Sequence, residues 1–159
     1  MTNPPTENVP CPARLVPVED QPFWDAIDEN RFMLAHCRCG AYYARLQACL
    51  RCDAAAQSMS WVPASGRGTV RTFVIFDKPY HPYFADRLPY VVAVVTLREG
   101  PEILTNVVDT EVATVEIGMP VKMVIRERGG QKIHQASAAV QFGEETASPP
   151  VRPSPSRSS

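Results

Sequence analysis

Four of the five cysteines fall between positions 37 and 52, where their spacing favours metal binding. Cys49 and Cys52 have the two-residue gap of a zinc knuckle, whereas Cys37 and Cys39 form a pair one residue shorter. Residues two apart in an extended segment point to the same face, so both sulfurs of the short pair can reach one ion. Zinc takes four such ligands at tetrahedral corners. We therefore predict one zinc ion bound by Cys37, Cys39, Cys49 and Cys52.

Two alternatives compete with this ligand set. His36 and Cys39 also have the two-residue gap, and a nitrogen with three sulfurs is an ordinary zinc set. The cysteines could instead be reduced, unligated thiols in a degenerate ribbon. We favour four cysteines and expect Cys11 to be free. A closed four-ligand site leaves no position for substrate, so the ion is expected to be structural.

No catalytic constellation emerges from the other polar residues. His81 and His134 lie outside any recognisable nucleophile or metal-base motif. The Gly-x-Gly from Gly66 to Gly68 precedes a predicted strand, so it cannot bind phosphate as a helix N-terminus does. We interpret it as a turn.

Composition restricts the class of protein. The chain has 159 residues, 45% hydrophobic, with 16 Lys and Arg against 17 Asp and Glu. This balance fits a globular protein and does not favour a nucleic-acid partner. No apolar run approaches the roughly 20 residues of a membrane helix, and the first ten residues lack signal-peptide features. We expect no membrane partner and a cytoplasmic location, in which the clustered cysteines favour metal ligation over disulfides.

The elements that must position the cysteines are predicted from periodicity. Apolar residues at spacings of three and four, with Pro22 in a first turn, predict a short helix over residues 21–30. Short strands are expected before and after the cysteine segment. Beyond Gly66, five strand candidates include two hairpins, one turning at Glu99-Gly100 and the other at Gly129-Gly130. The run at 91–97 is apolar on both faces and predicts a central strand.

Five strands in this arrangement suit a small closed barrel of the OB type, because closure removes exposed edges. A small β-sandwich is the structural competitor. The predicted fold is mainly β, with an N-terminal helix, a zinc ribbon, a five-stranded OB-fold barrel and disordered termini. The expected boundaries are a flexible segment at 1–20, the helix and lead-in strand at 21–36, the ribbon at 37–62, the barrel at 63–142 and a disordered Ser/Pro-rich tail at 143–159.

Several stretches together resemble a known family over about residues 22–138. They are PFWDAIDENRFML, the CRCG and CLRC pairs, GRGTV, HPYFADRLPYVVAVVTL, LTNVV and IGMPVKM. The family comprises bacterial and archaeal proteins that join a rubredoxin-like zinc ribbon to an OB-fold and are described as acyl-CoA-associated. The shortened first cysteine pair and the segment from His134 onward depart from the family pattern.

This resemblance implies a non-catalytic accessory subunit that forms a hetero-oligomer with a thiolase-like enzyme acting on CoA thioesters. The implied enzymes are aldolases and acyltransferases, including those of steroid side-chain and lipid degradation. The partner would carry the catalytic residues, the helix and ribbon would form the docking surface, and the barrel could contact acyl-CoA. Aromatics next to Pro-rich loops can anchor an interface, so we nominate Phe23, Trp24, Tyr83 and Phe84, each of which could equally belong to the core.

Two other functions remain open. OB barrels and zinc ribbons also occur in single-stranded nucleic-acid-binding proteins, although this sequence offers few cations for a phosphate-tracking groove. A stand-alone acyl-CoA-binding protein or hydrolase would use the barrel mouth as its site.

Overall fold

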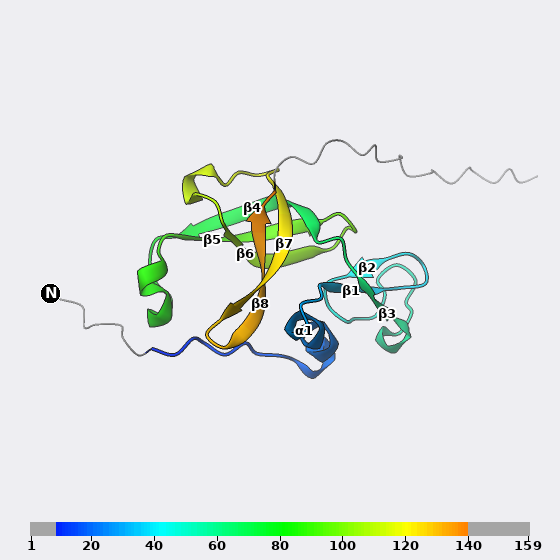
Figure 1. The fold of residues 1–159 in the computed structure, drawn as a ribbon. Helices are drawn as coiled ribbons and strands as arrows, with labels where there is room; N and C mark the ends of the chain where they lie inside the picture. The colour runs from blue at the N-terminus through cyan, green and yellow to red at the C-terminus, as the bar shows by residue number, and fades with distance from the viewer. Residues whose placement is uncertain (1–8, 140–159) are drawn as a thin grey trace, which may run out of the picture.

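The computed structural model describes residues 9–139, which form a small three-stranded sheet and a closed five-stranded barrel with one α-helix between them (Figure 1). The predicted mainly β fold with an N-terminal helix and a five-stranded barrel is confirmed. The predicted tail at 143–159 and positions 1–8 of the predicted flexible segment lie outside the described residues. Among the helices of residues 9–139, none is long and apolar enough to cross a membrane.

The small sheet holds the strands that flank the cysteines. Its antiparallel strands are β1 (Met33–His36), β2 (Tyr42–Tyr43) and β3 (Ser60–Pro63), in the order β2-β1-β3. The strands predicted before and after the cysteine segment therefore pair directly with each other, with Leu34 opposite Val62. β2 was not predicted, because two residues are too short to show a period. The pairing brings both ends of the cysteine segment to one place.

The barrel contains the remaining strands in the order β4-β5-β6-β8-β7. Hairpins β5–β6 and β7–β8 form as predicted, and the barrel closes where β6 pairs with β8 in parallel and β4 pairs with β7. The strand bounds are Arg67–Phe76 for β4, Tyr90–Leu97 for β5, Glu102–Val108 for β6, Pro120–Arg128 for β7 and Gln131–Ala138 for β8. Short 3-10 helices cover Val18–Asp20 (η1), Ala56–Ser58 (η2), Pro82–Arg87 (η3) and Val112–Thr114 (η4).

The strand predicted to be buried on both faces, β5, is fully buried on only one. Its burial alternates strictly: Val91, Ala93, Val95 and Leu97 point into the barrel, while the residues between them are half-buried. At the nearby Gly68 of β4, an added Cβ would lie 2.6 Å from a Val95 methyl group and 2.7 Å from the Thr96 carbonyl oxygen. Glycine is thus required there for β4 to approach β5 closely.

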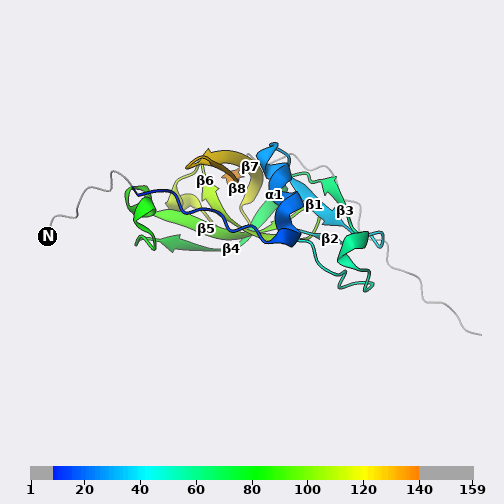
Figure 2. The same ribbon diagram turned by 90° about the horizontal axis from the view of Figure 1, so that it is seen from below.

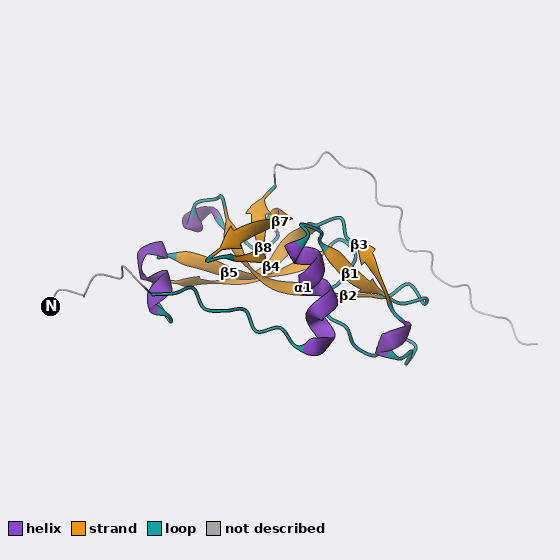
Figure 3. Cartoon of the chain, turned by 60° about the horizontal axis from the view of Figure 1, so that its bottom comes forward, coloured by secondary structure: helices purple, strands orange, loops and turns teal. Residues whose placement is uncertain are grey.

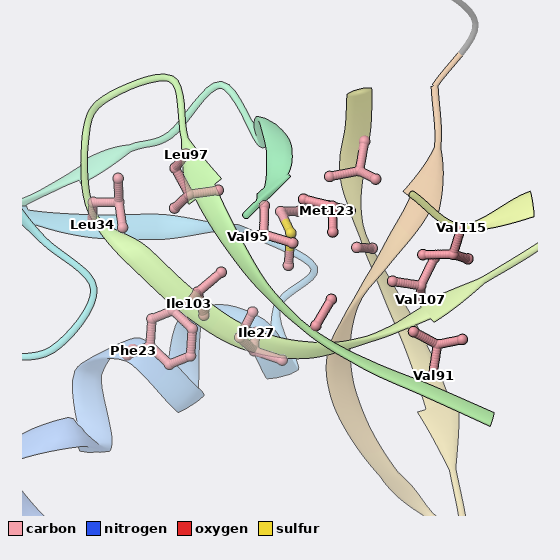
Figure 4. Close-up of a cluster of buried hydrophobic side chains, with 14 residues drawn as sticks. Phe23, Ile27, Leu34, Val91, Val95, Leu97, Ile103, Val107, Val115 and Met123 are labelled. Carbon is pink, nitrogen blue, oxygen red and sulfur yellow. The ribbon is translucent and has the colours of Figure 1, made fainter. Parts of the chain in front are cut away.

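Helix α1 (Gln21–Asp28) joins the two parts into one core (Figure 3). Pro22 stands in its first turn, where the missing N–H costs nothing. Phe23 and Ile27 on its buried face meet Leu34 of β1 and the inward side chains of the barrel (Figure 4). The small sheet and the barrel therefore share one apolar cluster and are held together by its burial.

The segment before α1 runs alongside the barrel (Figure 2). Arg14 fixes it: its backbone N–H donates to the Gln131 side chain at 2.9 Å, and its guanidinium donates to the Lys132 carbonyl at 2.6 Å and pairs with Asp28. Residues 9–20 therefore contact both β8 and α1 in the folded chain.

An imidazole lies in the contact between α1 and β8. The ring of His134 stacks on Trp24 at 5.6 Å, meets Phe23 edge-on at 5.7 Å and places its Nδ1 3.3 Å from the Thr105 hydroxyl. Burial among these rings lowers the pKa of His134 to about 4, since the charged form loses its hydration there. The folded protein thus holds this histidine neutral at acid pH values where an unfolded chain protonates it.

This histidine predicts an acid-sensitive stability. Because the folded pKa of about 4 lies below the ordinary value of 6.5, protons favour the unfolded chain as pH falls through 6.5 toward 4. We expect the free energy of unfolding to fall by on the order of 2 kcal/mol over this range from His134 alone. Urea unfolding at several pH values checks this. In His134→Gln, the free energy of unfolding should fall less steeply between pH 6.5 and 4 than in the wild type. An identical slope in both proteins would contradict the buried neutral imidazole.

Candidate metal centre

The first cysteine pair lies in the turn from β1 into β2. The Cys37 N–H donates to the Ala41 carbonyl at 2.8 Å, and the Gly40 N–H donates to the Cys37 carbonyl at 2.8 Å. Gly40 has φ +88°, a conformation that glycine adopts without steric cost. The turn closes tightly and directs the sulfurs of Cys37 and Cys39 to the same side.

The second pair lies in a matching turn. The Cys49 N–H donates to the Ala54 carbonyl and the Asp53 N–H to the Cys49 carbonyl, both at 2.8 Å, with Asp53 at φ +55°. In each turn, the backbone N–H of the first cysteine donates to a carbonyl further along the chain. The acceptor lies four residues on in the first turn and five residues on in the second. The short spacing of Cys37 and Cys39 is therefore accommodated by a turn that is shorter by one residue.

The four sulfurs converge at one point between the two turns. Cys37 and Cys52 lie 3.6 Å apart, Cys39 and Cys49 lie 3.5 Å apart, and all four sulfurs lie within 4.8 Å of one another. Zinc–thiolate bonds of about 2.3 Å at tetrahedral angles require sulfurs about 3.8 Å apart. These four close cysteines could therefore bind a metal ion. Cys37 and Cys49 are 2% and 1% exposed, so half of the ligand set lies in the protein interior.

A hydroxyl group supports the cluster from the adjacent strand. Tyr43 of β2 lies with its oxygen 3.4 Å from the Cys49 sulfur and accepts the Leu50 N–H at 3.0 Å. The hydroxyl oxygen is thus within hydrogen-bond distance of both the Leu50 amide and the Cys49 sulfur. The hydrogen bond to the Tyr43 hydroxyl is the largest influence that lowers the pKa of Cys49, to about 6. Sequence reasoning missed Tyr43, because only the β1–β2 pairing brings it to the sulfur.

The alternative ligand, His36, takes a different position. It ends β1, opposite Tyr42 on β2, and its ring lies 4.5 Å from the Tyr42 ring. Among the described residues, the group whose ligand atoms converge contains the four cysteines and not His36. Cys11 lies far from the cluster, beside Gly129 and Gln131 at the β7–β8 turn.

The four aromatic residues nominated as interface anchors lie in two places. Phe23 is 5% exposed and belongs to the core, whereas Trp24 is half-buried beside it. Tyr83 and Phe84 are half-buried in η3 at the other end of the barrel, with their rings 5.2 Å apart and edge-on. The structure does not bring these four side chains together, and their role in an interface stays a prediction.

An apolar pocket of about 300 Å³ lies beside α1. Trp24 and His134 line it, together with the exposed side chains of Leu15 and Leu104. Arg45, from the segment between the cysteine pairs, pairs there with Asp20, whose side chain is 7% exposed. This ion pair connects the cysteine segment to the start of α1, next to the pocket.

Comparison with known proteins places the chain in a family. Residues 61–126 match the family described as ChsH2, C-terminal OB-fold domain. The chain is 32% identical over 108 residues to a DUF35 domain-containing scaffold protein of Methanocaldococcus jannaschii, a match that covers 65% of this chain and 74% of that protein. It is 36% identical over 121 residues to a probable enoyl-CoA hydratase alpha subunit of Thermomonospora curvata, covering 73% of this chain but only 37% of that longer protein.

The same family appears among solved structures. The Ltp2-ChsH2(DUF35) aldolase contains a chain that superimposes with a TM-score of 0.71 and 27% identity, over 80% of this chain and all of that one. The family expected from the CRCG, CLRC and barrel motifs is thus confirmed by sequence and by structure. The chain belongs to the OB-fold ChsH2/DUF35 family.

Proposed function

We propose that this protein is a non-catalytic accessory subunit that docks on a thiolase-like enzyme acting on CoA thioesters. The observation that carries the proposal is the similarity to the complete DUF35 chain of the Ltp2-ChsH2(DUF35) aldolase. The relative named as an enoyl-CoA hydratase alpha subunit supports CoA thioesters as the substrate class. A steroid or other lipid acyl chain is the more specific substrate that the family resemblance suggests.

The docking surface that we propose surrounds the pocket beside α1. Leu15, Val18 and Leu104 are 90%, 87% and 66% exposed, and two of them line the pocket with Trp24. Exposed apolar side chains that cluster around a pocket are typical of protein interfaces. Trp24 presents a large ring at low entropic cost, which suits an anchor residue.

The metal ion that we propose for the cysteine cluster is a single structural zinc. Four sulfurs at nearly tetrahedral spacing favour zinc over the oxygen-preferring cations. When bound, zinc supplies cross-links between the two turns. Those turns lie in a segment whose only strand before β3 is the two-residue β2, so little else orders it. The ion thereby holds Arg45, and with it the start of α1, in position for docking.

Zinc content tests the metal centre. The purified protein should contain one zinc per chain, and Cys49→Ser or Cys52→Ser should lose both the metal and most of the folded protein. Cys11→Ser is the matched control, because Cys11 lies outside the cluster, and it should keep its zinc. Elemental analysis with circular dichroism measures both properties. Well-folded protein without metal would falsify the proposal.

The Tyr43 hydroxyl tests how the ligand set is supported. Tyr43→Phe keeps all four sulfurs but removes the hydrogen bond to Cys49, and loss of such an outer contact weakens metal binding by about 10-fold or more. Competition with a chromophoric chelator measures this affinity. Tyr42→Phe is the control, since Tyr42 packs on His36, and it should bind zinc as the wild type does. Equal affinities in the two variants would rule out a supporting role for Tyr43.

Coexpression with the thiolase-like protein encoded nearest in the same genome tests the docking. A stable hetero-oligomer is expected by size-exclusion chromatography with light scattering. Leu104→Asp should weaken it at least tenfold by calorimetry, because a carboxylate would enter an apolar contact. Ile117→Asp, at a side chain that is 70% exposed and outside the pocket, should leave it intact. No complex, or equal effects of the two substitutions, would overturn the proposed surface.

A further inference from the structure

A second pocket, of about 240 Å³, is lined by Asn106, Val107 and Val108 at the end of β6, whereas the pocket beside α1 is lined by residues at the start of β6. The adjacent residues His134 and Gln135 line different pockets, so the two sites share no lining residue. The second pocket is bounded by η3, the start of β5, the end of β6 and the tip of the β7–β8 hairpin. The side chains that matter are two arginines, two aromatics and two amides: Arg87, Arg128, Phe84, Tyr90, Asn106 and Gln135.

The pocket gathers positive charge without a counter-ion. Arg87 and Arg128 both line it, and no carboxylate does. Neither arginine forms an ion pair with another residue in the described part of the chain. The Nε of Arg128 is fully buried and has no hydrogen-bond acceptor. A buried donor without a partner is costly, so a hydrogen-bond acceptor at this site would be favoured, and the charge of the two arginines would favour an anionic one.

Arg128 is held in place by weak contacts only. Its Nη1 lies 3.5 Å from the Asn106 side-chain oxygen, and its guanidinium lies 5.3 Å from the centre of the Phe84 ring. Arg87 similarly lies over the Tyr83 ring at 4.4 Å. Both guanidiniums are thus oriented by aromatic faces, which leaves their N–H groups available to an acceptor.

Flat apolar surface lies next to this charge. The rings of Phe84 and Tyr90 are 5.6 Å apart, and Tyr90 is itself stacked on Phe76 at 5.0 Å with an angle of 12° between the rings. Tyr90 is therefore fixed in orientation. Rigid aromatic faces of this kind stack with planar rings such as nucleobases.

We propose that this pocket binds a small organic phosphate that also carries a flat ring, of the mononucleotide class. Arginine guanidinium groups match phosphate oxygens in a two-point geometry, while the aromatic wall accepts the ring and the two side-chain amides select its polar edge. A polynucleotide is disfavoured because the volume holds one unit and the net charge of −1 provides no field along a strand. The site does not depend on the proposed partner.

Binding to the full chain tests this site. Titration calorimetry with adenosine 5′-monophosphate and adenosine 3′,5′-bisphosphate should show saturable binding, at least tenfold tighter than adenosine or inorganic phosphate alone. The ¹⁵N resonance of the buried Arg128 Nε should shift as the site fills. Absence of binding by both nucleotides, or tighter binding of a ten-residue oligothymidylate, would overturn the proposal.

Variants locate the binding within the pocket. Arg128→Gln should weaken nucleotide binding at least tenfold, and the exposed Arg87→Gln should do the same if the first variant fails to fold. Arg126→Gln is the matched control on the same strand: Arg126 pairs with Asp109 outside the pocket, so its loss should change affinity less than twofold. Binding that survives substitution of both pocket arginines would show that the nucleotide binds elsewhere.

Discussion

The convergence of four cysteine sulfurs is the constraint on which the smaller half of this structure depends. Between β1 and β3 the chain forms only the two-residue β2 and a single 3-10 turn. Of the side chains in this stretch, only Cys37 and Cys49 are buried to the extent of core residues. A segment with so little apolar burial cannot offset its loss of conformational entropy unaided. The zinc ion proposed above would cross-link its two turns at the sulfurs and so give the segment a defined shape.

Helix α1 connects the cysteine segment to the rest of the molecule. It shares a core with β1 and the barrel through Phe23 and Ile27, and the Arg45–Asp20 ion pair joins its start to the cysteine segment. The pocket beside α1 is thus built from three parts of the chain: the start of α1, the cysteine segment and the barrel. Because the second pocket is lined by η3 and the end of β6 and shares no lining residue with the first, the barrel can carry a separate binding site without disturbing that surface.

Much of the fold could be predicted because it depends on local pattern. Alternating or apolar runs predicted the barrel strands, and the turns at Glu99-Gly100 and Gly129-Gly130 predicted both hairpins. The parallel closure of β6 on β8 and the one-sided burial of β5 depend on tertiary packing, which periodicity does not contain.

The residues of the candidate sites were also predictable only where local sequence identifies them. The spacing of the four cysteines was enough to predict that they form one cluster. Tyr43 reaches Cys49 only through strand pairing, and Arg87 approaches Arg128 only because η3 lies against the tip of a distant hairpin. A single sequence contains no pattern that marks such residues, because their role depends on neighbours that only the tertiary structure brings close.

X-ray absorption at the zinc edge of the purified protein tests the central claim most directly, because it identifies both the metal and its ligands. Four sulfur neighbours at about 2.3 Å, with no nitrogen or oxygen in the first shell, are expected for Cys37, Cys39, Cys49 and Cys52 acting together. A protein that is folded but lacks zinc, or a first shell that contains an imidazole nitrogen in place of one sulfur, would contradict it.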